Sequence, residues 1–356
     1  RSAGGMIDVS PLYKYEIYGP DASKLVNRIM TRNIDKCKIN QVMYTPWCDE
    51  DGKVIDDGTI TKLEENRYRI TAADPSLRWF QDCGYGMQAE VIDVSEELAA
   101  LAVQGPKSLQ IINATVDTEN FDNLKYYWAT HTKIDDFPIT LTRTGYTGDL
   151  GFELWVNPKY AEKLWDILMS KGKSYGLAPI GLVALDMLRV EAGYLMIEVD
   201  YISTFKAIIE EQKSSPFEIG LGWTVDLEGS DFIGKKALVK EKKSGIKWDF
   251  IGLDINWFDL EKKYSKGNLP PQVPGQVSRN PLPLYKQGRQ VGQATSITFS
   301  PTLKKYIAIG TIESSMANLG DEVDIEITVE YARKTAKAKL VKPSFFNPKR
   351  KRAVKK

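Results

Sequence analysis

Two adjacent carboxylates interrupt a run of apolar and β-branched residues, Val54-Ile55-Asp56-Asp57-Gly58-Thr59-Ile60. Neighbouring residues of a strand point to opposite faces of the sheet, so one of the two aspartates is expected to face inward. A carboxylate that leaves water is costly unless it has a partner or a task. The pair is therefore a candidate for acid–base or electrostatic chemistry, and a turn or bulge at Asp57-Gly58 is the alternative.

A second candidate is the glycine-rich segment Arg143-Thr144-Gly145-Tyr146-Thr147-Gly148-Asp149-Leu150-Gly151-Phe152-Glu153. Glycine permits sharp turns and a close approach of the backbone to a ligand. The segment would wrap a planar ligand while Glu153 accepts paired N–H donors; the alternative is a hairpin with an outward-facing glutamate. It matches neither G-x-G-x-x-G nor a phosphate loop, so nucleoside triphosphate chemistry is not indicated.

The remaining reactive residues exclude several classes of site. A single histidine, His131, cannot build a histidine-rich metal site or an H-E-x-x-H protease, and no metal is expected. The three cysteines are far apart, which fits a reducing compartment, and we expect a cytoplasmic protein. Asp186 and Arg189 lie three residues apart in a predicted helix, which favours a local ion pair.

Composition sets the class of protein. The 356-residue chain is 42% hydrophobic and 27% charged, which excludes disorder as the dominant state and predicts two or three globular domains. No run of about 18 apolar residues occurs, so neither a membrane span nor a membrane partner is expected. The chain begins at Arg1 and enters a strand-like pattern almost at once, so we expect that further residues precede it.

Six of the last eight residues are basic, and the formal net charge is +1, so the rest of the chain is mildly acidic. We interpret residues 349–356 as a solvated terminus. The alternative is a handle for nucleic acid, but one short run without interleaved aromatic residues does not indicate a nucleic-acid partner.

A strand, a Gly-Pro dipeptide and a helix follow one another twice, at 13–30 and at 98–112, which indicates duplicated α+β units. The second half adds helices at 158–170 and 181–192. The five prolines of 264–285 predict a long loop that is neither helix nor central strand. Further strands are predicted in two groups. They lie at 42–48, 54–63, 68–73 and 139–156, and then at 290–299, 306–312, 322–329 and 333–341.

Together these segments resemble the aminomethyltransferase family, which comprises the folate-dependent T-protein of glycine cleavage and its relatives. The resemblance follows nearly the whole chain in order. It is carried by Met6-Ile7-Asp8-Val9-Ser10, Asp49 to Asp57, Gln104-Gly105-Pro106-Lys107, Arg143 to Gly148 with Gly151-Phe152-Glu153, Leu188 to Ala192, Pro216-Phe217-Glu218, Phe232-Ile233-Gly234-Lys235 and Phe299 to Leu303.

The resemblance implies an α+β fold, a three-domain cloverleaf of two ferredoxin-like α+β units and a C-terminal β-barrel or sandwich, with folate in a central channel. The implied domains are two interleaved folate-binding units within 1–245, a β domain at 246–345 and a basic tail at 346–356. The first unit joins 1–12 to 98–205, and the second joins 13–97 to 206–245.

The resemblance also implies tetrahydrofolate as cofactor and a role for each matched residue. Asp57 corresponds to the catalytic aspartate near the folate N5 and N10 atoms. Glu153 corresponds to the glutamate that pairs with the pterin. Tyr44 and Tyr146 correspond to tyrosines that line the folate pocket, and Trp223 to an aromatic residue near the ligand.

Several positions depart from the family pattern. Leu185 replaces an arginine of the glycine cleavage enzyme, Pro11 replaces a histidine, and Ala72 or Ala73 replaces a pocket asparagine. These changes argue against a lipoyl carrier protein as partner. We therefore expect a demethylase that moves a methyl group from a small N-, S- or O-methylated substrate to N5 of tetrahydrofolate. The alternatives are the aminomethyltransferase of glycine cleavage and a folate-binding module without catalysis.

Overall fold

The computed structural model describes residues 1–116 and 121–354. The chain divides into two compact units. Unit 1 comprises Arg1–Gly181, Thr224–Ala237 and Pro348–Lys356, and unit 2 comprises Leu182–Trp223 and Leu238–Asn347. The domain boundaries implied by the sequence stay a prediction.

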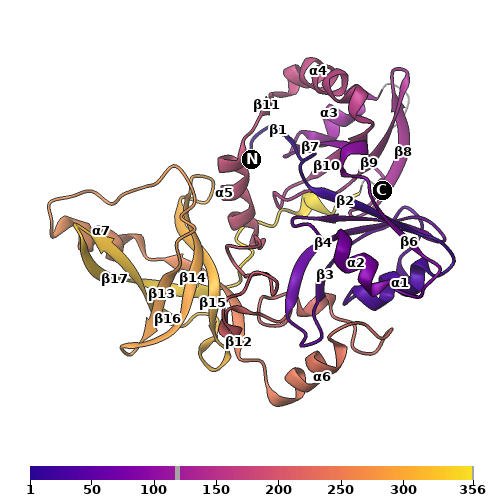
Figure 1. The fold of residues 1–356 in the computed structure, drawn as a ribbon. Helices are drawn as coiled ribbons and strands as arrows, with labels where there is room; N and C mark the ends of the chain where they lie inside the picture. The colour runs from indigo at the N-terminus through magenta and orange to yellow at the C-terminus, as the bar shows by residue number, and fades with distance from the viewer. Residues whose placement is uncertain (117–120, 355–356) are drawn as a thin grey trace. The chain divides into compact units, whose positions relative to one another are not determined.

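Unit 1 contains a six-stranded sheet in the order β11-β1-β7-β10-β9-β8, antiparallel except for the β1–β11 pair. Helices α3 and α4 lie against this sheet (Figure 1), and their apolar side chains, which include Ile111 and Leu164, are buried in its core. The elements are β1 (Gly4–Asp8), β7 (Ala99–Gln104), α3 (Ser108–Thr115), β8 (Ala129–Ile134), β9 (Phe137–Thr142), β10 (Gly151–Val156), α4 (Ala161–Gly172) and β11 (Leu177–Pro179).

The second sheet of unit 1 has five strands in the order β3-β4-β5-β2-β6, all antiparallel. Leu25 and Ile29 lie four residues apart on one face of α1 and are buried in its core, whereas Lys24 and Arg28 face solvent. The elements are β2 (Tyr13–Tyr18), α1 (Ala22–Ile29), β3 (Val42–Cys48), β4 (Val54–Glu64), β5 (Arg67–Ala72), α2 (Leu77–Cys83) and β6 (Glu90–Asp93).

Main-chain hydrogen bonds join the two sheets of unit 1. The N–H of Val42 in β3 donates to the carbonyl of Tyr127 at 2.9 Å, and the N–H of Ala129 in β8 donates to Asn40 at 2.7 Å. The N–H of Tyr127 donates to Arg143 at 3.0 Å, at the start of the glycine-rich loop. This joint therefore connects the strand that carries Tyr44 to the loop that precedes β10.

Unit 2 contains a closed barrel of six strands in the order β12-β15-β14-β13-β16-β17. Helix α5 precedes the barrel strands in the chain, and α7 lies between β12 and β13 in sequence. Helix α6 begins in unit 1 and ends in unit 2. The elements are α5 (Leu182–Ala192), α6 (Lys235–Ser244), β12 (Trp248–Ile255), α7 (Trp257–Ser265), β13 (Leu282–Lys286), β14 (Arg289–Ser300), β15 (Lys305–Glu313), β16 (Glu322–Val329) and β17 (Ala332–Val341).

The repeated strand, Gly-Pro and helix pattern has the same backbone conformation in both copies. Gly19 has φ 122° and Gly105 has φ 119°. A Cβ atom would lie 2.7 Å from the carbonyl oxygen of Gln88 at the first position and 2.5 Å from that of Ala3 at the second. Each glycine is therefore required twice over, by its positive φ and by the neighbouring backbone.

The α+β class with a C-terminal β-barrel is confirmed, but two local predictions are wrong. The proline-rich loop covers only 266–281, because α7 ends at Ser265 and β13 begins at Leu282 and pairs with both β14 and β16. Pro283 is tolerated because pairing with β16 starts only at Leu284.

The C-terminal tail is only partly the solvated terminus that its charge predicts, since Lys349 and residues 352–354 are exposed but Arg350 and Lys351 are not. Lys351 is 5% exposed, and residues 348–354 group with unit 1; Lys355 and Lys356 lie outside the described residues. Across residues 1–116 and 121–354, no helix has the length and apolar character needed to span a membrane.

We expect Gly58→Ala to destabilise the five-stranded sheet by about 1–3 kcal/mol or more, because the new Cβ overpacks the sheet. It would lie 1.8 Å from the carbonyl oxygen of Thr71 on the neighbouring strand. Urea unfolding followed by tryptophan fluorescence measures the change. Gly181→Ala is the control, since nothing lies within 4 Å of its Cβ; equal effects of the two substitutions would contradict the expectation.

Candidate active site

The hydroxyl of Tyr44 on β3 donates a hydrogen bond to Asp57 Oδ2 on the adjacent strand β4, at 2.5 Å. Both side chains are partly exposed. Burial, the charge of Asp57 and this hydrogen bond raise the pKa of Tyr44 well above its usual value, and the hydroxyls of Tyr146 and Tyr127 act in the same direction. Tyr44 therefore remains a protonated donor that orients the Asp57 carboxylate.

Asp56 is the inward-facing member of the pair, as strand alternation predicts, with 0% of its surface exposed. Its Oδ1 accepts the N–H of Asp57 at 2.7 Å, and its Oδ2 accepts the N–H groups of Ala73 and Asp74 at 3.1 and 3.0 Å. Burial and the charge of Asp57 raise the pKa of Asp56 to about 8. The predicted alternative of a turn at Asp57-Gly58 is wrong, since β4 runs through both residues.

Glu153 on β10 pairs with Ala102 of β7 and Thr142 of β9. Its Oε2 accepts hydrogen bonds from the hydroxyls of Thr144 at 2.7 Å and Thr142 at 3.4 Å. Burial raises the pKa of Glu153, and the two hydroxyl donors oppose that shift. Within residues 1–116 and 121–354, no group donates to Oε1, so this oxygen can accept N–H donors from a ligand.

The glycine-rich loop between β9 and β10 brings the two carboxylates into one region of unit 1. It carries Thr144, which bonds Glu153, and Tyr146, whose hydroxyl contributes to the pKa of Tyr44. Four of the five predicted site residues thus come from two sheets and one shared loop. Trp223 belongs to unit 2, where 63% of it is exposed, and all five functional roles stay predictions.

Two glycines of this segment, Gly145 and Gly151, make room for the Gln104 side chain. A Cβ atom would lie 2.0 Å from the Gln104 amide at Gly145 and 2.1 Å from it at Gly151. The buried amide donates to the carbonyls of Thr144 and Phe152 at 3.1 and 3.3 Å. The Gln104 side chain therefore holds the backbone of the glycine-rich loop in place. Its position in a Gln-Gly-Pro motif did not predict this role.

In unit 2, the predicted pair Asp186–Arg189 is part of a larger buried network. The fully buried Arg189 guanidinium donates to Asp186 at 2.8 Å, to Asp200 and to Ser296 at 2.8 Å. Thr295 and Ser296 of β14 donate to Asp200 at 2.5 and 2.7 Å. The network attaches α5 to the barrel, so its role is structural.

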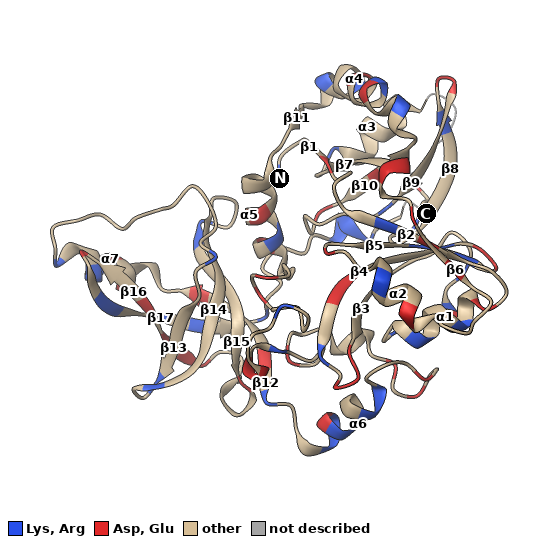
Figure 2. Ribbon diagram, viewed as in Figure 1, with Lys and Arg blue, Asp and Glu red and all other residues tan. Residues whose placement is uncertain are grey.

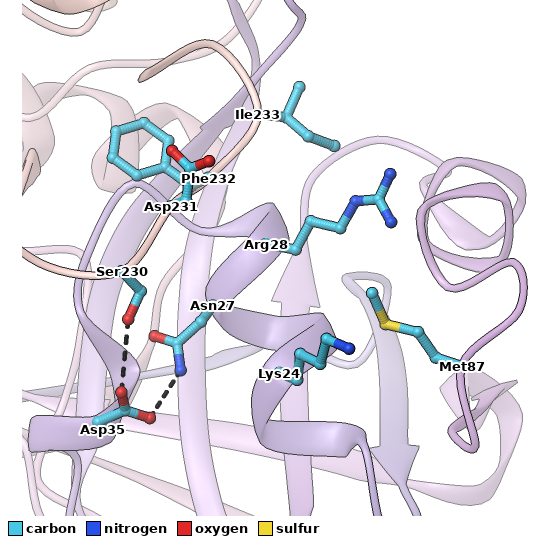
Figure 3. Close-up of a pocket in the computed structure, with 9 residues that line it drawn as sticks. All are labelled: Lys24, Asn27, Arg28, Asp35, Met87, Ser230, Asp231, Phe232 and Ile233. Carbon is cyan, nitrogen blue, oxygen red and sulfur yellow. Dashed lines mark hydrogen bonds between the residues drawn. The ribbon is translucent and has the colours of Figure 1, made fainter. Parts of the chain in front are cut away.

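Two further candidates lie apart from the predicted site residues. A pocket of about 740 Å³ lies beside α1 and contains none of the predicted site residues; Figure 3 shows its lining. His131 is exposed on β8, with Nδ1 3.0 Å from Thr140 Oγ1. Throughout the part of the chain that the structure describes, no three His, Cys, Asp or Glu side chains are grouped to hold a metal ion.

The raised pKa of Asp56 predicts a pH-dependent stability. Between about pH 4 and pH 8 the folded chain binds this proton and the unfolded chain does not, so the free energy of unfolding falls as pH rises. The slope contributed by one proton is at most about 1.4 kcal/mol per pH unit. Urea unfolding at pH 5 to 8 should show a flatter dependence for Asp56→Asn than for the native chain. The exposed Asp51→Asn is the control, and parallel curves for native and Asp56→Asn would refute the assignment.

Two family models match the chain. The GCVT N-terminal domain matches residues 1–229, and the glycine cleavage T-protein C-terminal barrel domain matches residues 271–347. The crystal structure of the glycine cleavage system aminomethyltransferase T from Bartonella henselae has a TM-score of 0.81 at 23% identity and shares the fold. The match covers 100% of this chain and 89% of that one.

Relatives of known name are similar over most of their length. An aminomethyltransferase from Halothermothrix orenii is 34% identical over 331 residues, which are 92% of this chain and 85% of that protein. An aminomethyltransferase from Clostridium botulinum is 32% identical over 357 residues, which are 99% of this chain and 88% of that protein. The resemblance seen in the sequence is thereby confirmed, and this chain belongs to the glycine cleavage T-protein family.

Proposed function

We propose that this chain is a folate-dependent aminomethyltransferase, which moves an aminomethyl group from a carrier protein to tetrahydrofolate and releases ammonia. The observation that carries the proposal is the similarity to proteins named aminomethyltransferase over 92% to 99% of the chain. The sequence-based hypothesis favoured methyl transfer from a small methylated substrate. The names of the relatives favour the aminomethyl alternative instead.

The residues around Glu153 fit a pterin. A pterin presents its N3–H and its 2-amino group side by side, and a carboxylate accepts two such bonds in parallel. Thr144 holds Glu153 Oε2, and no described residue donates to Oε1. Tyr146 and Tyr44 supply aromatic walls, and burial of Glu153 strengthens each hydrogen bond that it accepts.

Asp57 acts next to the reacting atoms. Tetrahydrofolate, when bound, supplies the nitrogen atoms that take up the one-carbon group. Asp57, oriented by Tyr44, stabilises the positive charge that develops there and accepts a proton at its carboxylate. Asp56 Oδ1 accepts the main-chain N–H of Asp57 and so holds the Asp57 backbone in place. Within the acid pair, Asp57 is the reacting group and Asp56 the positioning group.

Methyl transfer to tetrahydrofolate is the second candidate, and Leu185 favours it because the sequence resemblance places an arginine of the glycine cleavage enzyme there. The chain, tetrahydrofolate and an aminomethylated lipoyl carrier protein are incubated together, with a panel of methylated small molecules in parallel. Ammonia and methylene-tetrahydrofolate support aminomethyl transfer, whereas 5-methyl-tetrahydrofolate supports methyl transfer. Binding of folate with neither product would identify a non-catalytic module.

Glu153→Gln should weaken tetrahydrofolate binding by about 10- to 100-fold, because loss of a charged acceptor costs about 1.5–3 kcal/mol. Isothermal titration calorimetry of the purified variant measures the dissociation constant. Glu162→Gln, on an exposed position of α4, is the matched control. An unchanged dissociation constant for Glu153→Gln would remove this residue from the folate site.

Asp57→Asn should lower turnover by about 100-fold or more while folate still binds, because the substitution keeps the shape but removes the charge and the proton acceptor. Single-turnover product formation measures the chemical step directly. Asp51→Asn, in the turn before β4, keeps the hairpin and should turn over normally. Near-native turnover by Asp57→Asn would overturn the catalytic assignment.

A further inference from the structure

The C-terminal strap, residues 348–353, is held against the glycine-rich loop by a buried arginine. Arg143 is 2% exposed. Its Nη2 donates to the carbonyls of Arg350, Lys351 and Ala353 at 3.1, 3.2 and 2.6 Å, and its Nη1 donates to Leu124 at 2.7 Å. One side chain at the start of the loop therefore binds three carbonyl groups within the last turn of the described chain.

A second attachment runs in the opposite direction, from the strap to the loop. Arg350 donates to both carboxylate oxygens of Asp149, at 2.6 and 2.8 Å. The Asp149 side chain is 1% exposed, and its Oδ1 also accepts the N–H of Leu150 at 2.7 Å. Arg1 Nη1 lies 3.7 Å from Asp149 Oδ2, but only Arg350 binds both carboxylate oxygens, so it is the main partner of this buried carboxylate.

The strap also contacts the aromatic ring of Tyr126. Lys351 Nζ lies 5.3 Å from the centre of the Tyr126 ring, and Arg352 Cζ lies 5.6 Å from it. Tyr126 packs edge-on against Tyr127 at 4.5 Å, and Tyr127 is close enough to Tyr44 to act on its pKa. Figure 1 shows the strap in yellow within unit 1, and Figure 2 shows its basic residues in blue.

We propose that the C-terminal strap is a positioning element of the site, in which Arg143, Asp149 and Arg350 hold the loop so that Thr144 stays on Glu153 and Tyr146 stays beside Tyr44. The identity of the ligand at that site rests on the proposed function, whereas the role of the strap rests on these contacts alone. Three of its basic residues serve attachment within the chain, because the side chains of Arg350, Lys351 and Arg352 contact Asp149 or Tyr126 in unit 1.

Arg350→Gln tests the strap with two measurements. Hydrogen exchange of the amides in 143–150, on the full chain without folate, should become at least about tenfold faster, a change equivalent to about 1.4 kcal/mol. The KM for tetrahydrofolate should rise about tenfold with kcat within about twofold, because the loop must be ordered again when folate binds. Lys349→Gln, which removes an exposed charge from the same turn, should leave both measurements at native values.

A chain that ends at Asn347 is the second variant, and adding a peptide of residues 348–354 should restore slow exchange in the loop. Arg350→Lys keeps the positive charge but loses the paired N–H donors of the guanidinium. Its exchange rates and KM should therefore lie between those of the native chain and those of Arg350→Gln. Unchanged exchange in Arg350→Gln overturns the proposal, as does faster exchange with an unchanged KM. If the native chain neither binds nor uses folate, the proposed function fails, while the exchange measurements still decide whether the strap holds the loop.

Discussion

The joint between the two sheets of unit 1 is the constraint on which the site depends. Val42, Tyr127 and Arg143 are connected by two main-chain hydrogen bonds of 2.9 and 3.0 Å. Tyr127 occupies the left-handed region at φ 62° to make both bonds at once, a conformation that is costly for a bulky residue unless its surroundings impose it. Without this joint, the strand that carries Tyr44 and the loop that carries Thr144 would have no fixed relation.

Around this joint, hydroxyl and backbone groups donate hydrogen bonds to each carboxylate of the site. Tyr44 donates to Asp57, Thr144 donates to Glu153, and three N–H groups donate to Asp56. Neutral donors orient a carboxylate without cancelling its charge. The Asp57 and Glu153 carboxylates therefore stay available to a cationic or N–H-rich ligand, whereas Arg143 acts on the strap.

Local patterning predicted most of the regular structure. In each Gly-Pro repeat, the alternation of apolar and polar residues predicted the strand, and apolar residues at helical spacing after the Gly-Pro dipeptide predicted the helix. Alternation also predicted the late strands of the barrel. Several elements were missed, among them α2, β6, β8, β11 and α6. Of the others that were missed, α7 and β12 lie between charged or proline-rich segments, and β13 contains a proline. Closure of the barrel depends on pairing between distant strands, which no local pattern encodes.

In the candidate site, too, local sequence identified some residues and long-range pairing determined the rest. Asp57 and Glu153 stand out in the sequence because acidic residues rarely interrupt apolar strands, and the family resemblance gave them roles. The hydroxyl partners of Glu153 were not predictable, because Thr144 and Thr142 are ordinary residues until the strands are paired. The strap was misjudged for a related reason: its charge predicts solvation, whereas its position at the end of the chain allows it to reach Arg143, 207 positions earlier.

Gln104 limits how this loop can change over evolutionary time. While its amide lies under the loop, no side chain fits at position 145 or 151. Shortening it first would leave the carbonyls of Thr144 and Phe152 without their donor. Each single step passes through a less stable intermediate, so the glutamine and the two glycines are expected to be inherited as a set and to be replaced only together.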